Sequence, residues 1–206
     1  MKSFSLVCLA ALLLPCALAG CRQTGAVPGL TDAEKALING SDSVMRVLVV
    51  GNPSDEKVLR SRSIDFSDQD LQSEEYSTLA SYMLRTVTDP SQDGVGIAGP
   101  QVGIGRRIIA VQRFDKEGEP FEVYPNIRVE SLWGEVVRGK EGCLSIPGRR
   151  GVVPRYSGVT VSYKDPRTLE TVRDSVEGFT AVIFQHETDH LEGILYTDRA
   201  DSVFVK

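Results

Sequence analysis

Two histidines four residues apart are the strongest chemical signal in the sequence. They occur in residues 185–190, QHETDH. On a helix this spacing places both imidazoles on one face, where they can bind the same cation. Glu187, next to the first of them, can then lie beside the ion without ligating it, where a general base is needed. The segment therefore predicts the helical part of a metal-dependent hydrolase site.

The alternative is that His186 and His190 are ordinary core or surface histidines whose spacing is accidental. A chance match of this five-residue pattern in a chain of this size has a probability on the order of one in a hundred. The chain has 2 histidines in all, and both fall here. This concentration favours the ligand interpretation.

A catalytic metal site needs a third protein ligand and a position open to water. Cys143, upstream in residues 141–145 (EGCLS), is one candidate, since a metal would keep its thiol deprotonated and a thiolate is a strong, soft donor. A buried, inert thiol is the alternative for this residue. Downstream of the second histidine the acidic candidates are Glu192, Asp198 and Asp201.

The N-terminus has the pattern of an export signal. Lys2 precedes an apolar run that is too short to span a bilayer, and small residues follow as far as Gly20. Residues 18–21, LAGC, resemble a bacterial lipobox, in which cleavage precedes the cysteine and its sulfur is acylated. We expect residues 1–20 to be a signal peptide and Cys21 to carry a lipid anchor to a membrane surface. A plain secretory signal or an uncleaved anchor is the alternative.

This interpretation leaves one cysteine in the exported domain. Cys8 and Cys16 would leave with the signal, and Cys21 would be acylated. Cys143 would then have no disulfide partner, so its thiol is either buried and inert or chemically employed.

Composition places the remainder among ordinary soluble domains. The chain has 206 residues, of which 41% are hydrophobic and 25% charged, enough for one domain with a core. The net charge of -5, with scattered basic residues, gives no sign of nucleic-acid binding.

The hydrophobic pattern predicts an α+β fold in which short antiparallel strands surround a central C-terminal helix. Residues 21–43 read as a tether with one short helix that starts at a capping box, TDAE at 31–34. Residues 44–206 form the single domain. Its expected helices are 74–87 and 179–191, and its expected strands are 45–50, 107–113, 121–124, 127–137, 159–164 and 171–176.

Three segments together resemble the motifs of peptide deformylases, in the same order: residues 94–101 (GVGIAGPQ), 141–145 and 185–190. The similarity extends over most of residues 45–197. It implies Cys143, His186 and His190 as ligands of one divalent ion, Fe²⁺ first, with Zn²⁺, Ni²⁺ or Co²⁺ as substitutes. One departure is Gly99, where the family commonly has alanine.

The resemblance also implies the reaction and its groups. Glu187 would act as general base and then as acid, while Gln101 and the Leu144 N–H would face the developing oxyanion. The substrates would be N-formylmethionyl peptides or protein N-termini, and the products formate and a free amine. We expect a monomer.

Other residues would support the substrate. Gly94 and Gly96 let the backbone approach a ligand, and a peptide could pair there as an added strand, although a simple tight turn is the alternative. An unbranched apolar side chain such as methionine would enter a pocket, whose expected lining is Val95, Gly96, Phe179, Val182 and Ile183. Ordinary core is the alternative for these residues.

Two carboxylates are expected to support the metal ligands without binding the metal themselves. Asp189 and Glu141 are expected to hold Arg155 or nearby backbone.

The export signal conflicts with the usual cytosolic setting of deformylases. We therefore expect an enzyme of the cell envelope, on the periplasmic or surface face, or a cytoplasmic one if the signal is not processed. Two other functions compete with this one: a zincin-like endopeptidase, and a catalytically silent lipoprotein that binds metal or formyl-peptides. The presence of both Gln101 and Glu187 argues against mere metal binding.

Overall fold

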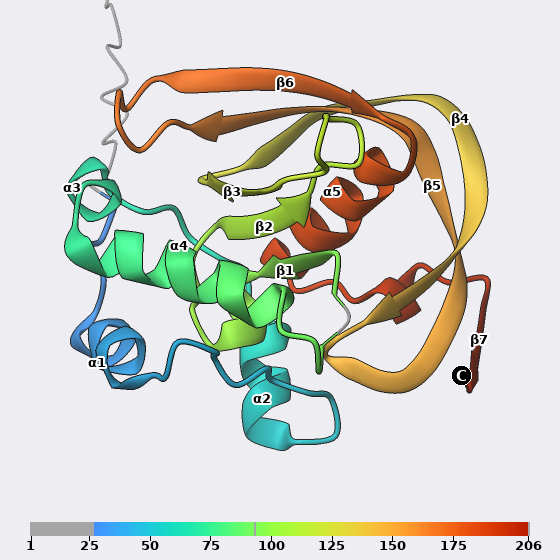
Figure 1. The fold of residues 1–206 in the computed structure, drawn as a ribbon. Coiled ribbons are helices and arrows are strands. Elements are labelled where there is room, and N and C mark those ends of the chain that lie inside the picture. Colours follow the sequence, from blue (N-terminus) through green and yellow to red (C-terminus); the bar gives the residue numbers. More distant parts are fainter. Residues whose placement is uncertain (1–26, 93, 206) are drawn as a thin grey trace, which may run out of the picture.

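The computed structural model describes residues 27–92 and 94–205 (Figure 1). The expected signal peptide and Cys21 lie outside the described residues. Within the described part of the chain, no helix is long and apolar enough to cross a membrane.

Two antiparallel sheets enclose one helix. The first sheet has the order β1-β2-β3, and the second has the order β4-β5-β6, with β7 paired to β5. The strands are β1 Gly96–Ala98, β2 Ile108–Gln112, β3 Phe121–Pro125, β4 Arg128–Cys143, β5 Ile146–Lys164, β6 Thr171–Glu177 and β7 Ser202–Val205. Figure 1 shows the last helix, α5 (Gly178–Leu191), between the sheets. The α+β prediction with a central C-terminal helix is confirmed.

The β1-β2-β3 sheet is buried on both faces. One face, with Ile97, Ile108 and Ala110, packs in a cluster that includes residues of α4 (Glu74–Val87). The other face, with Ile109 and Val111, packs with residues of α5. This two-sided burial explains why β2 is a continuous apolar run without alternation.

The expected helices form where local signals begin them. In α4 the side chain of Ser73 accepts a hydrogen bond from the Tyr76 N–H at 3.1 Å, which caps the first turn. In α1 (Asp32–Gly40) Thr31 and Glu34 form the expected capping box. Four short helical segments were not predicted, namely α2 (Pro53–Leu59), α3 (Asp68–Leu71), η1 (Gly99–Val102) and η2 (Tyr196–Asp198).

Three of the predicted strands, 45–50, 127–137 and 159–164, differ from the structure. Residues 45–50 do not form a strand; their N–H groups bond other segments, as in Leu48 to the Gln101 carbonyl at 2.8 Å. β4 and β5 have 16 and 19 residues, so these strands are not short. Register shifts along this pair let the long hairpin bend around α5 (Figure 1).

The described part of the expected tether packs against the domain. Leu30 and Ile38 are buried in the same cluster as α4. The buried guanidinium of Arg106 donates to the carbonyls of Pro28 and Gly29, at 2.7 and 2.6 Å, and to the Glu34 carboxylate. From Pro28 onward, therefore, the chain is part of the folded unit.

Candidate metal centre and active site

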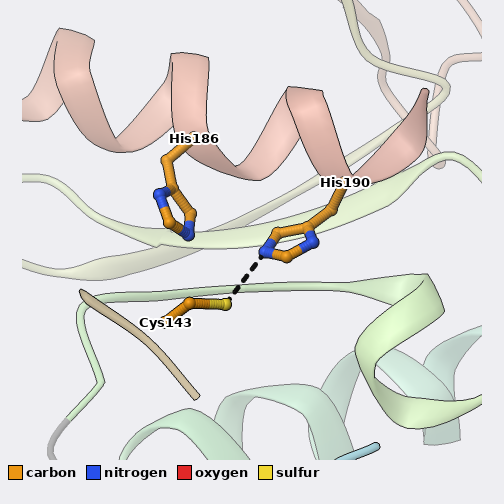
Figure 2. Close-up of side chains that lie close together, drawn as sticks. All are labelled: Cys143, His186 and His190. Carbon is orange, nitrogen blue, oxygen red and sulfur yellow. Dashed lines mark hydrogen bonds between the residues drawn. The ribbon is translucent and has the colours of Figure 1, made fainter. Parts of the chain in front are cut away.

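Helix α5 carries both histidines into the interior. Gly178 begins the helix with a φ of 68°, a left-handed conformation that glycine adopts without strain. His186 and His190 are buried, and their ring centroids lie 5.1 Å apart. Figure 2 shows both rings pointing from α5 toward Cys143.

Cys143 reaches the histidines from the end of β4. It pairs with Ile146 of β5 across the tight turn at Leu144 and Ser145. Its Sγ lies 3.3 Å from Nε2 of His190, and one ligand atom from each of the three residues lies within 4.8 Å of the others. Side chains more than forty residues apart in sequence thus converge on one point.

A carboxylate fixes the orientation of the His186 ring. Nδ1 of His186 lies 2.8 Å from Oε2 of Glu141, which leaves Nε2 to face Cys143. Arg155 donates two hydrogen bonds to Glu141 and a third, at 2.6 Å, to Asp189. Burial opposes ionisation of Glu141, but hydrogen bonds from His186 and Arg155 outweigh it and hold its pKa at about 2. The expected role of Asp189 and Glu141 in holding Arg155 is confirmed.

The donor set fits a transition-metal ion. A thiolate and two imidazoles are the three ligands of an open catalytic site that keeps a fourth position for water. Burial lowers the pKa of His190 well below its ordinary value, which keeps that ring neutral as ligation requires. The carboxylate on Nδ1 of His186 is the usual partner of a ligating histidine.

Glu187 lies beside this centre with a carboxyl oxygen free. The side chain is 4% exposed, and its Oε2 is buried without a hydrogen-bond partner among the described residues. Burial, together with the negative charge of Glu141, raises its pKa to about 7. Such a carboxyl group can both take and give a proton near neutral pH.

Gly96 makes room for that carboxyl group. A Cβ at this position would lie 2.5 Å from Oε1 of Glu187. The glycine is therefore required by a close approach, whereas the alternative interpretation was a simple turn. Gly94 also has close neighbours, since a Cβ there would lie 3.2 Å from Cδ1 of Leu144.

Hydrogen bonds fix the side-chain amide of Gln101. It lies in the 3₁₀ helix η1 (Gly99–Val102), where its Oε1 accepts from the Ala98 N–H at 2.8 Å. Its Nε2 donates to Sγ of Cys143 at 3.4 Å and to Oγ of Ser145 at 3.2 Å. The donor end of the amide is thereby directed at the ligand cluster.

One cavity of about 520 Å³ joins these groups. The six expected substrate-binding residues line it: Gly94, Val95, Gly96, Phe179, Val182 and Ile183. The expected metal ligands Cys143 and His186, the expected base Glu187 and the expected oxyanion donors Gln101 and Leu144 line it as well. His190 is 1% exposed and lies behind the lining. Phe179, 56% exposed, stands at the edge against Phe114.

Sequence reasoning did not include the basic residues of the same cavity. Lys140, Arg149 and Arg150 line it as well. No motif assigned them to the site, although Lys140 directly precedes the segment 141–145; the hairpin of β4 and β5 brings Arg149 and Arg150 to the same place.

The family model described as Polypeptide deformylase matches residues 44–204. The chain belongs to this family. It is therefore a metal-dependent hydrolase that removes the N-formyl group from peptides. The peptide deformylase of Leptospira biflexa serovar Patoc is 33% identical over 167 residues, which cover 78% of this chain and 89% of that protein.

Solved deformylase structures share the fold. A class I type b enzyme from Acinetobacter baumannii with bound Met-Ala-Ser has a TM-score of 0.67 and 35% identity, and the match covers 76% of this chain and 98% of that one. An enzyme from Synechococcus elongatus in complex with actinonin has a TM-score of 0.67 and 34% identity, with 79% and 83% covered.

The departure at Gly99 has a structural reason. A Cβ there would lie 2.7 Å from the carbonyl oxygen of Arg106 and 2.9 Å from that of Ile104. The backbone is too close for the alanine common in deformylases, so an alanine at this position would force the neighbouring segment to move.

Proposed function

We propose that this deformylase holds one divalent ion with Cys143, His186 and His190 and uses Glu187 to hydrolyse the N-formyl group from N-formylmethionyl peptides at the cell envelope. The observation that carries the proposal is the convergence of one sulfur and two imidazoles beside a buried carboxyl group that has a free oxygen.

The side chains divide the chemistry between them. When bound, a divalent ion would lower the pKa of water toward neutrality and polarise the formyl carbonyl. Glu187 accepts the proton of the attacking water and passes it to the leaving amine. Gln101 Nε2 and the Leu144 N–H donate to the oxygen that becomes negative at the formyl carbon. Formate and a free N-terminal amine leave.

The substrate side chain would enter beside α5. Val95, Val182 and Ile183 give this part of the cavity an apolar wall suited to an unbranched side chain. The related enzyme that was solved with Met-Ala-Ser supports methionine as the occupant. β1 is at the edge of its sheet, so the peptide backbone could pair with it as a further strand.

Fe²⁺ is the proposed metal, with Zn²⁺, Ni²⁺ or Co²⁺ as substitutes. A Cys-His-His set binds any of these ions, and supply and oxygen then decide which one is held. Metal analysis of protein purified without oxygen from its native cell tests this choice, and a stoichiometric metal other than iron would contradict it.

The proposed location follows from the sequence of the N-terminus. Cleavage before Cys21 and acylation of its sulfur would anchor the monomeric enzyme to a membrane surface, on the periplasmic or outer face, where exported or foreign formyl-peptides are the substrates. Mass spectrometry of the native N-terminus tests this directly. An intact signal on a protein found only in the cytosol would contradict it.

Formate release from formyl-Met-Ala-Ser tests the reaction. Protein prepared without oxygen should release formate, and Glu187→Ala should lower kcat about 10²- to 10⁴-fold, the usual contribution of a general acid–base group. Metal content is the matched control, since Glu187 is not a ligand in this scheme. A Glu187→Ala variant that turned over as fast as the wild type would contradict the role assigned to Glu187.

A further inference from the structure

A second cavity, of about 800 Å³, lies on the other side of α5. Gln185, Thr188 and Asp189 of the helix line it, whereas His186 and Glu187 line the active site. Because successive residues of an α-helix are rotated by about 100°, these two sets of residues lie on different faces of α5. None of the proposed catalytic groups or metal ligands lines the second cavity.

Large apolar side chains are exposed around this cavity. Five of its lining residues are 38% to 45% exposed: Val27, Ile64, Val129, Leu132 and Tyr156. They come from separate parts of the chain, and the fold gathers them on one surface, which we call the rear face. Apolar groups gathered in this way mark an interaction surface.

Arginines predominate among the charged residues of the rear face. Its cations are Arg62, Arg107, Arg128, Arg155 and Arg199, against the three carboxylates Asp65, Asp189 and Glu192. The five cations outnumber the anions here, although the whole chain has a net charge of -5. The side chains of Arg62, Arg128 and Arg199 are 80%, 49% and 45% exposed, and each pairs with one of the three carboxylates: Glu192, Asp65 and Asp189, respectively. The face therefore keeps an excess of two cations over its own anions.

The N-terminal chain enters the domain at this same surface. Val27 lines the cavity, and Cys21 precedes it by 6 positions. Six residues span about 20 Å at full extension, so an acyl chain on Cys21 would hold the rear face close to the bilayer. The anchor, the apolar rim and the arginines therefore point to one partner.

We propose that the rear face lies on the surface of a membrane that contains anionic lipid. This proposal rests on the acylation of Cys21 proposed above. The apolar rim enters the headgroup region, and the exposed arginines meet lipid phosphates. The active-site cavity, on the other side of α5, then opens away from the bilayer and receives peptides from water.

Tryptophan fluorescence tests the contact. The chain has 1 tryptophan, Trp133, so Trp133→Phe with Leu132→Trp places the only indole on the rear face. The matched control is Trp133→Phe with Leu37→Trp, because Leu37 on α1 is 41% exposed, like Leu132 at 43%, and does not line the cavity. Both full-length acylated proteins are inserted into phosphatidylcholine–phosphatidylglycerol vesicles with brominated acyl chains, and retained formate release shows that each is folded.

The expected result is a blue shift and bromine quenching for the indole at position 132, and neither for the indole at position 37. Vesicles of phosphatidylcholine alone should give less quenching at position 132. Equal spectra at the two positions would overturn the proposal, as would a blue shift at position 132 without vesicles, which indicates a second copy on this face.

The mass of Cys21 tests the lipid anchor independently of the contact between the rear face and the membrane. If the mass of Cys21 shows no acyl chains, the envelope location fails and the rear-face proposal fails with it. If acyl chains are present and the indole at position 132 remains unquenched, only the rear-face proposal fails.

Discussion

The two faces of helix α5 satisfy their polar groups in opposite ways. On the rear face, Gln185 makes three hydrogen bonds, two of them to Tyr156, and Thr188 donates to the Phe184 carbonyl at 2.7 Å. On the catalytic face, Oε2 of Glu187 and Nδ1 of His190 are buried without a partner among the described residues.

Within the fourteen residues of α5, one side supports the fold through satisfied hydrogen bonds, and the other side carries the groups proposed for chemistry. A buried polar group without a partner costs about 1–3 kcal/mol, more when charged, so the side of α5 that carries Glu187 and His190 bears a cost that the side with Gln185 and Thr188 does not. Unsatisfied groups on this otherwise well-bonded helix thus lie on the side that carries the proposed chemistry. Substitutions on the two faces should therefore have different consequences.

Apart from the loss of Glu187 itself, the largest effect on kcat is expected at the proposed oxyanion donor. Gln101→Ala removes the Nε2 that is directed at the ligand cluster, so kcat for formate release should fall about 10²- to 10³-fold. Steady-state kinetics at matched metal content measure this. A rise in KM with kcat unchanged would place Gln101 in ground-state binding and break the proposed division of roles.

The cost of the unpartnered carboxyl group should appear in the stability of the metal-free protein. Because burial raises the pKa of Glu187 from 4.5 to about 7, the folded state binds a proton that the unfolded state has lost between these values. Wild-type stability therefore falls as pH rises through this window. Glu187→Gln should be more stable than the wild type by on the order of 3 kcal/mol above pH 7, and by much less below pH 4.5.

Urea unfolding of both metal-free proteins across this pH range measures the difference. A stability difference between the two proteins that is the same at acid and neutral pH would show that the surroundings of Glu187 do not destabilise its ionised form.

A methyl group placed beside Glu187, the proposed base, should lower activity somewhat less. Gly96→Ala places a Cβ 2.5 Å from Oε1 of Glu187, so the carboxyl group must move. A displacement of this kind should lower kcat about 100-fold, with metal content unchanged. Gly139→Ala, where a Cβ meets nothing within 4 Å, is the matched control and should retain activity.

The smallest effect is expected on the rear face. Thr188→Val keeps the shape of the side chain and removes the hydroxyl that donates to the carbonyls of Phe184 and Gln185, so it should cost about 1 kcal/mol of stability. Its kcat should match the wild type. Thermal unfolding and formate release measure the two quantities, and a large loss of activity would show that the faces of α5 are not independent.

Local patterns were sufficient for much of this molecule. Helix α4 has the expected bounds because its apolar stripe and its Ser73 cap lie within one stretch of sequence. The two histidines were recognised for the same reason, since a helical spacing is a local property. Residue types alone left Cys143 open, because its distance from His190 is set by the β4–β5 hairpin, and only the family resemblance singled it out.

The elements that were not predicted depend on pairing between segments far apart in the sequence. The N–H groups of Leu48 and Val50 donate to Gln101 in η1 and to Ser145 in the β4–β5 turn, and a strand-like composition does not reveal that choice of partners. The full length of β4 and β5 also escaped prediction: the expected strand 127–137 ended before Gly139 and the expected strand 159–164 began after Gly158, whereas the structure includes both glycines in one bent hairpin. The rear face, built from distant segments, had no local signal at all.

The burial of Arg106 has a practical consequence for anyone who shortens this chain. The family match begins at residue 44, and a truncation there would look natural. Such a truncation would remove the carbonyls of Pro28 and Gly29, which accept hydrogen bonds from the buried Arg106. It would also remove the Glu34 carboxylate that neutralises this guanidinium. Expression trials should begin upstream of Val27, since the minimal foldable fragment is longer than the minimal recognisable one.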